Sequence, residues 1–115
     1  MLRDQWLLVR LQSQDGLSGW CEITGSCDDS AVASLLSDLT ESLSGKNLLA
    51  IKNCCSLLEN WRYPVVRTIR TVSTALSGLN QALWDLTARY YNVPLYKLYG
   101  ADGVDSIPLY ANLNK

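Results

Sequence analysis

The 115-residue chain contains no histidine, and its four cysteines form no Cys-x-x-Cys pair. Cysteines at such spacing, often combined with histidines, are the usual sequence signature of a zinc site. Zinc binding here would need thiolates to converge from scattered positions, at Cys21, Cys27, Cys54 and Cys55. The sequence therefore favours buried or partly buried free thiols in a reducing compartment.

Charge and long apolar runs are also scarce. Charged residues make up 18% of the chain, and 10 basic against 11 acidic residues leave a net charge of −1. The only basic cluster, Arg62, Arg67 and Arg70, is typical of a solvated helix face, so we predict no nucleic-acid partner. No stretch reaches the roughly 18 apolar residues that span a bilayer, and no signal-peptide pattern opens the chain. A cytoplasmic protein without a membrane partner is expected.

The first part of the chain has the pattern of a β-hairpin. Residues 6–14 and 20–24 are rich in strand-forming side chains, and Asp15-Gly16 supplies a turn between them. Because side chains alternate between the two faces of a strand, Leu7, Val9 and Leu11 share one face. We predict that this face packs on the core.

Three helices are expected to follow the hairpin. Asp28, Asp29 and Ser30 offer N-cap side chains for a first helix that Gly45 ends. A second helix is predicted over residues 49–61 and a third, the longest, over residues 67–91. The third carries one apolar stripe at alternating steps of three and four residues: Ile69, Val72, Leu76, Leu79, Leu83, Leu86 and Tyr90.

Gly78 interrupts this long helix, where glycine costs about 1 kcal/mol relative to alanine. A close contact with another helix or with a strand would explain its presence. A short helical segment then stops at Gly100, and residues 107–113 (IPLYANL) have the alternation of a further strand.

Three blocks, in this order, resemble one known family. Residues 15–22 (DGLSGWCE) are similar to its D-G-x-x-G-W-G-E pattern, and residues 78–100 hold an Ala-Leu-Trp-Asp core followed by x-Pro-Leu-Tyr-x-Leu-x-Gly. Residues 107–112 (IPLYAN) are similar to the segment that enters the first strand of its catalytic barrel. Together the blocks resemble the N-terminal capping domain of the mandelate racemase and muconate lactonizing enzyme group, within the enolase superfamily.

Two departures accompany this resemblance. Cys21 stands where the family usually has glycine, so the backbone there must tolerate a side chain. Only five residues precede Trp6, where the family has a strand and a mobile loop that closes over the substrate.

The resemblance implies an α+β fold, in which a short antiparallel hairpin or meander precedes a bundle of about three helices, as in the enolase N-terminal domain. Residues 1–105 would form the capping domain, without the usual first strand and lid loop. Residues 106–115 would start a truncated barrel domain and supply the first strand of a missing (β/α) barrel.

The resemblance also implies a reaction. Family members remove a proton α to a carboxylate, and Mg²⁺ stabilises the resulting enediolate. Three carboxylates and a Lys-x-Lys pair, or a histidine with an aspartate, supply the metal ligands and bases from the barrel. This chain has neither histidine nor Lys-x-Lys, and its carboxylates are scattered. We therefore expect no catalytic residue, no metal ligand and no cofactor in this chain, and no activity from the chain alone.

Two residues are the expected substrate contacts. Thr24 lies in the loop after the hairpin, which in the family leans over the barrel mouth. Asn112 lies near the carboxyl end of the first barrel strand, where barrel active sites are built.

Other conspicuous side chains fit structural roles better. The adjacent pair Asp28 and Asp29 fits helix capping rather than metal binding. Asp85 fits a hydrogen bond or ion pair, within the cap or to the barrel. Trp20 and Trp84 are expected in the core rather than stacked on a ligand.

The leading interpretation is the capping-domain fragment of a Mg²⁺-dependent acid-sugar dehydratase, or of a related cycloisomerase or racemase. Its partners would be the missing barrel domain, a small-molecule carboxylate and, in the intact enzyme, further copies of itself. The alternative is a non-catalytic interaction or oligomerisation module from a truncated gene. A third interpretation is an unrelated small α+β binding domain. A Lys-x-Lys followed by spaced acidic residues downstream of residue 115 would separate the first two.

Overall fold

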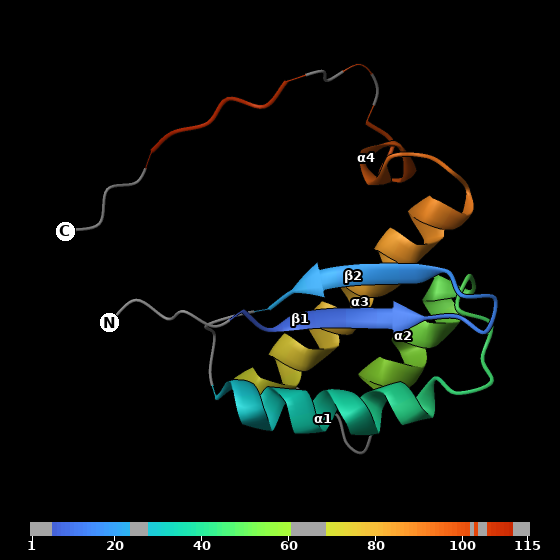
Figure 1. Cartoon of the computed structure of the whole chain (residues 1–115), viewed down its shortest axis with the longest axis vertical. Coiled ribbons are helices and arrows are strands. Elements are labelled where there is room, and N and C mark those ends of the chain that lie inside the picture. The colour runs from blue at the N-terminus through green and yellow to red at the C-terminus, as the bar shows by residue number, and fades with distance from the viewer. Residues whose placement is uncertain (1–5, 24–27, 61–68, 102, 104–105, 112–115) are drawn as a thin grey trace.

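The computed structural model describes residues 6–23, 28–60, 69–101, 103 and 106–111. Its elements run β1 (Leu8–Gln12), β2 (Ser18–Glu22), α1 (Asp29–Ser42), α2 (Ile51–Glu59), α3 (Arg70–Tyr90) and α4 (Leu95–Leu98) (Figure 1). This two-stranded antiparallel sheet followed by helices confirms the predicted α+β class. Within the described ranges, no helix has both the length and the apolar character needed to cross a membrane.

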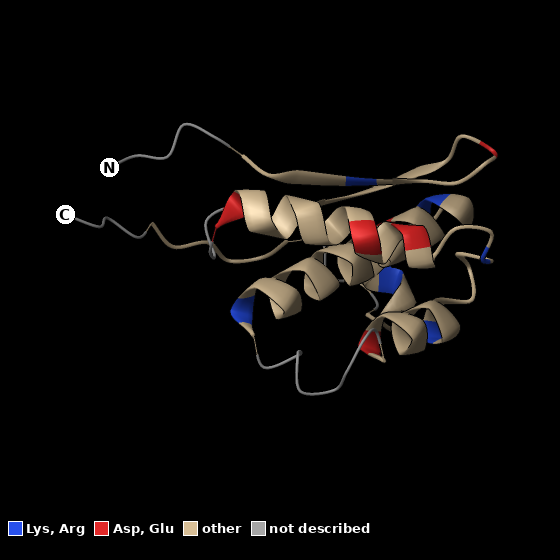
Figure 2. Ribbon diagram, turned by 90° about the horizontal axis from the view of Figure 1, so that it is seen from below, with Lys and Arg blue, Asp and Glu red and all other residues tan. Residues whose placement is uncertain are grey.

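The hairpin and the helices form layers around one core. Figure 2 shows the two strands along one side of the molecule, with the helices on the other. Helix α3 is central, since it packs against both strands, α1 and α2. The largest fully buried side chains of the core are Leu39, Leu79, Leu83, Leu86, Val32 and Cys54.

Strands β1 and β2 pair with Val9 opposite Cys21 and Leu11 opposite Gly19. Val9, Leu11 and Cys21 are buried, and Leu7 is partly buried against the same cluster. The predicted inward face of the first strand is therefore confirmed. Cys21 occupies the core side of β2, so the side chain that departs from the family pattern serves as a packing residue.

Asp28 is the N-cap of α1. Its carboxylate accepts hydrogen bonds from the backbone N–H groups of Ser30 (3.0 Å) and Ala31 (3.3 Å), and from the Ser30 hydroxyl (2.6 Å). These bonds favour the charged form and lower the pKa of Asp28, with the Ser30 hydroxyl as the largest cause. The predicted capping role is confirmed for Asp28, while Asp29 lies in the first turn of the helix.

Two glycines let the hairpin lie close to α3. A Cβ atom at Gly19 would overlap the carbonyl oxygen of Ala82 and lie 2.6 Å from the backbone nitrogen of Leu86. A Cβ atom at Gly78 would lie 2.9 Å from Cγ2 of Ile23, the residue that follows β2. The close helix–strand contact expected at Gly78 is confirmed, and Gly19 makes a tighter one against backbone.

The ends of the predicted helices differ from the structure. Helix α3 begins at Arg70, and residues 67 and 68 lie outside the described residues. Two predicted stripe positions are exposed, Ile69 at 53% and Tyr90 at 56%. Ile69 is the N-cap of α3 and Tyr90 is its last residue, so both lie beyond the strands and helices that cover its middle. The second helix is shorter than predicted and ends at Glu59.

The strand predicted over residues 107–113 does not form in the described part of that segment. Residues 106–111 are neither helix nor strand, and Ile107, Leu109 and Tyr110 are 77%, 93% and 88% exposed. A strand requires a neighbour for its backbone hydrogen bonds. The described chain places no strand beside this segment.

Replacing Leu83 by alanine tests the central role of α3. Leu83 is fully buried, so Leu83→Ala is expected to lower the free energy of unfolding by about 2–5 kcal/mol, measured by urea denaturation. Leu57→Ala, on the exposed side of α2, is the control and should cost about 0.5 kcal/mol or less. Equal losses in the two variants would contradict the assignment of the α3 stripe to the core.

The N-cap carboxylate predicts a pH dependence. Because the pKa of Asp28 is lowered in the folded state, its contribution is present above the unfolded pKa and is lost as pH falls through the folded value. Asp28→Asn keeps a capping side chain that does not titrate. Thermal unfolding scans should therefore show a smaller loss of stability on acidification below about pH 4 in the variant than in the parent chain. Parallel pH profiles would refute this role.

Candidate functional site

The two predicted substrate contacts, Thr24 and Asn112, both lie outside the described residues. Their described neighbours differ in setting. Ile23 is buried, and its backbone N–H donates to the carbonyl oxygen of Leu7 (3.0 Å), so the residue that precedes Thr24 is fixed to the sheet. Ala111, which precedes Asn112, is exposed. The structure therefore does not test whether the side chains of Thr24 and Asn112 lie close together.

Asp85 joins α3 to the outer edge of β2. Its Oδ2 accepts a hydrogen bond from the backbone N–H of Trp20 (2.9 Å) and an ion-paired one from Nε of Arg89 (2.9 Å). The sequence predicted a hydrogen bond or ion pair for Asp85, and both are present within the domain. This carboxylate is thus committed to holding the hairpin on the helix.

Trp20 corrects a prediction. It was expected in the core, yet it is 45% exposed on the outer face of the sheet, where the guanidinium of Arg10 lies 5.6 Å from the ring centroid. The cause is the alternation of β2, because Gly19 and Cys21 take the inward positions against α3. Arg10 also donates from Nε to the hydroxyl of Ser18 (3.2 Å), which fixes the stack.

Aromatic side chains gather where α3 ends and α4 begins. Trp84 is half-buried and meets Tyr99 with ring centroids 5.1 Å apart, so its predicted packing role holds in part. The neighbouring rings of Tyr90 and Tyr91 meet edge to face at 5.2 Å. The side chains of four tyrosines are each more than two-fifths exposed: Tyr90, Tyr91, Tyr96 and Tyr99. We call Trp84, Tyr90, Tyr91, Tyr96 and Tyr99 the aromatic end of the molecule.

The described cysteines are free thiols. Burial raises the pKa of Cys21, Cys54 and Cys55, and the nearby Glu22 carboxylate adds to the effect at Cys21. A raised pKa keeps a thiol protonated and poorly nucleophilic at neutral pH. Among the residues that the structure describes, no group of three or more histidine, cysteine or carboxylate side chains could hold a metal ion.

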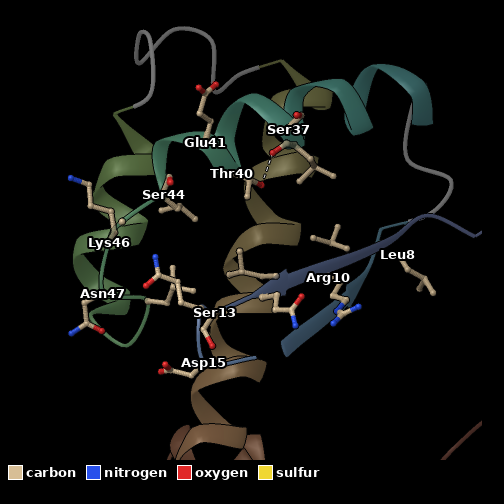
Figure 3. A pocket seen from close by; sticks show the side chains of 18 of the residues that line it. Leu8, Arg10, Ser13, Asp15, Ser37, Thr40, Glu41, Ser44, Lys46 and Asn47 are labelled. Carbon is tan, nitrogen blue, oxygen red and sulfur yellow. Dashed lines mark hydrogen bonds between the residues drawn. The ribbon is translucent and has the colours of Figure 1, made fainter. Parts of the chain in front are cut away.

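A groove of about 1190 Å³ lies beside β1 (Figure 3). It is lined by β1, by α1 and by the connection from α1 to α2. Its two carboxylates, Asp15 and Glu41, lie at opposite ends in this view, so they form no acid–base pair. The sequence did not reveal this groove.

Asp85 and Arg89 differ in their expected contributions to stability. Asp85→Ala removes a charge-assisted bond to the β2 backbone and should lower the free energy of unfolding by about 1–3 kcal/mol. Arg89→Ala removes only a half-exposed ion pair and should cost about 0.5 kcal/mol or less. Urea unfolding measures both, and amide exchange at Trp20 should quicken in the first variant alone. Equal costs would exclude the anchoring role of Asp85.

Comparison with known proteins places these features in a family. Residues 1–100 match the family described as mandelate racemase / muconate lactonizing enzyme, N-terminal domain. The chain is 26% identical over 107 residues to a D-galactonate dehydratase of Variovorax paradoxus (strain S110), covering 93% of this chain and 28% of that protein. It is 28% identical over 96 residues to a D-galactonate dehydratase of Verminephrobacter eiseniae (strain EF01-2), covering 84% of this chain and 25% of that protein.

A solved structure agrees with these relatives. It is an enolase from Agrobacterium radiobacter, provisionally described as a galactarate dehydratase, with sodium and L-malate bound. It superposes with a TM-score of 0.68 at 34% sequence identity, covering 83% of this chain and 24% of that one. The chain thus spans about a quarter of the length of the proteins it is similar to.

Proposed function

Because the chain belongs to the mandelate racemase / muconate lactonizing enzyme family through its N-terminal domain, we propose that it caps the active site of an acid-sugar dehydratase, or of a related racemase or cycloisomerase. The observation that carries this proposal is the family match over residues 1–100, together with relatives named as D-galactonate dehydratases. Residues 1–105 would be the cap, and residues 106–115 would begin a barrel domain that carries the bases for α-proton abstraction.

The described residues do not fit a Mg²⁺ site. Mg²⁺ takes oxygen ligands in near-octahedral geometry, and the described part of the chain offers no cluster of three potential ligands. Asp85 already accepts bonds from Trp20 and Arg89. We therefore assign Mg²⁺, where the reaction uses it, to the barrel domain and not to the described residues.

The cap would contribute contacts that select and orient the substrate. The loop predicted to begin at Thr24 would follow Ile23, which is held by its bond to Leu7 and by its packing on Gly78. A loop that starts from a fixed point loses less freedom when it closes on a ligand. The hydroxyl of Thr24 and the amide of Asn112 suit the hydroxyl and carboxylate groups of an acid sugar.

The aromatic end is the proposed contact surface for the barrel. Four of its five rings are between 44% and 61% exposed, and large exposed aromatic surfaces mark interaction sites. The segment 106–111 leaves from this end, after α4 (Figure 1). A domain that follows in the chain would therefore emerge beside the aromatic end. Free thiols in the described residues are in keeping with a cytoplasmic location, and we include further copies among the partners of the intact enzyme.

A second candidate function is a non-catalytic interaction module. The open groove beside β1 and the exposed segment 106–111 favour it, since both are surfaces that a partner could cover.

Reconstitution tests the capping function. The 115-residue chain is mixed with the barrel portion of the Agrobacterium radiobacter enzyme, and dehydration of galactarate and D-galactonate is followed with Mg²⁺ present. The chain alone should be inactive and the mixture active. Thr24→Ala should raise KM while binding to the barrel portion, measured by calorimetry, is unchanged. Tyr99→Ser should weaken that binding instead.

Two results would count against the proposal. One is α-proton exchange by the chain alone in deuterated water, above a heat-denatured control. The other is a chain that folds but does not bind the barrel portion.

A further inference from the structure

Among the residues that the structure describes, no strand pairs with the outer edge of β1. Ile23 donates to the carbonyl of Leu7 (3.0 Å) and Ser13 donates to the carbonyl of Leu17 (2.9 Å), so the bonded pairs fall on odd-numbered residues of β1. The N–H and C=O groups of the even-numbered Leu8, Arg10 and Gln12 therefore point away from β2. No backbone hydrogen bond among the described residues uses them. Such a row of unpaired groups is a template for another strand.

The groove of about 1190 Å³ runs along this edge. Buried Leu11, Leu36 and Leu43 contribute apolar lining, and exposed α1 residues such as Ser37 and Glu41 line it too (Figure 3). Helix α1 thus lies under the position of the next strand. A second copy of β1 would bring its own α1 into that space, so a symmetric pairing of two β1 edges is obstructed. A single extended segment fits.

The chain itself carries such a segment. Residues 106–111 (SIPLYA) hold no charged side chain, form no helix or strand, and expose Ile107, Leu109 and Tyr110 almost fully. Figure 1 shows this segment leaving α4, on the β2 side of the sheet, whereas the groove lies on the β1 side. We propose that the groove binds residues 106–111 of a second copy of this chain, which add to β1 as a third strand.

Backbone chemistry selects a parallel orientation. In a parallel pair, Leu8 and Arg10 form backbone hydrogen bonds with residues of the added strand whose side chains lie on the opposite face of the sheet from their own. That opposite face is the one toward the groove. Ile107, Leu109 and Ala111 then face the groove and make the bonds. The nitrogen of Pro108, which carries no hydrogen, then points away from β1. A proline in this position is tolerated in an edge strand. In an antiparallel pair with the same face inward, Pro108 would have to donate a bond that it cannot make.

Two copies that exchange their segments would form a closed dimer, because each offers one groove and one strand. This inference uses only β1, α1 and residues 106–111. It does not rest on the proposed capping function. The reconstitution with a barrel can fail while the dimer forms, and the dimer can fail to form while the reconstitution succeeds.

Substitutions at adjacent residues of the segment test the proposal. Sedimentation equilibrium of the full 115-residue chain should give a dimer, with amides of Leu8, Arg10 and Gln12 slow to exchange. Leu109→Asp places a charge in the groove and should give a monomer. Tyr110→Asp, whose side chain faces solvent in the docked strand, is the matched control and should remain a dimer. Circular dichroism confirms that each variant is folded.

A second pair of variants tests the edge. Arg10→Pro removes the Arg10 side chain and, from the backbone, only an outward N–H, so β1 keeps its backbone bonds to β2. The added strand loses one bond, and the dimer should dissociate about tenfold more readily. Arg10→Ala removes the same stack on Trp20 and keeps the N–H, so its dimer should persist. A monomeric parent chain, whether or not its segment amides are protected, overturns the proposal. A dimer that survives both Leu109→Asp and Arg10→Pro also overturns it.

Discussion

The absence of a side chain at Gly19 is the constraint on which this fold depends. A two-stranded hairpin is marginally stable by itself, so β1 and β2 require a helix pressed against them. Gly19 lets the backbone of β2 approach the Ala82 carbonyl of α3 so closely that a Cβ atom would overlap it. Gly78 allows the same close approach on the helix side, where the side chain of Ile23 lies against the helix backbone. The hairpin is therefore placed by contact with α3 rather than by its own two-strand pairing.

This close approach determines what the neighbouring residues can do. With Gly19 and Cys21 turned inward, Trp20 faces solvent and its N–H points to Asp85. The carboxylate is thereby used for anchoring, which leaves it unsuited to proton transfer or metal binding. The described part of the chain accordingly offers shape, a sheet fixed to α3 and an aromatic end.

Local patterns predicted most of the fold. The alternation of Val9 and Leu11, the cap at Asp28 and the middle of the α3 stripe depend on short-range periodicity and appear as expected. Positions that depend on which elements meet were missed. Trp20 is exposed because β2 turns its small residues to α3, and Tyr90 because it is the last residue of that helix.

The candidate site was less accessible to sequence reasoning. Family likeness, not periodicity, pointed to Thr24 and Asn112, and both fall outside the described residues. The open edge of β1 follows from hydrogen-bond direction and from the place of α1, neither of which a single strand pattern contains. The same residues 106–111 are a candidate for a barrel strand and for the groove, and they cannot occupy both at once.

The link between Trp20 and Asp85 has a consequence for synthesis on the ribosome, because it joins residues 65 positions apart. At about 5–20 residues per second, roughly 3–13 s separate the appearance of β2 from that of its anchor. Throughout that interval the apolar face of the hairpin has no α3 to cover it. Until its longest helix emerges, a nascent chain with this topology leaves exposed the side chains of Val9, Leu11 and Cys21, which the folded domain buries.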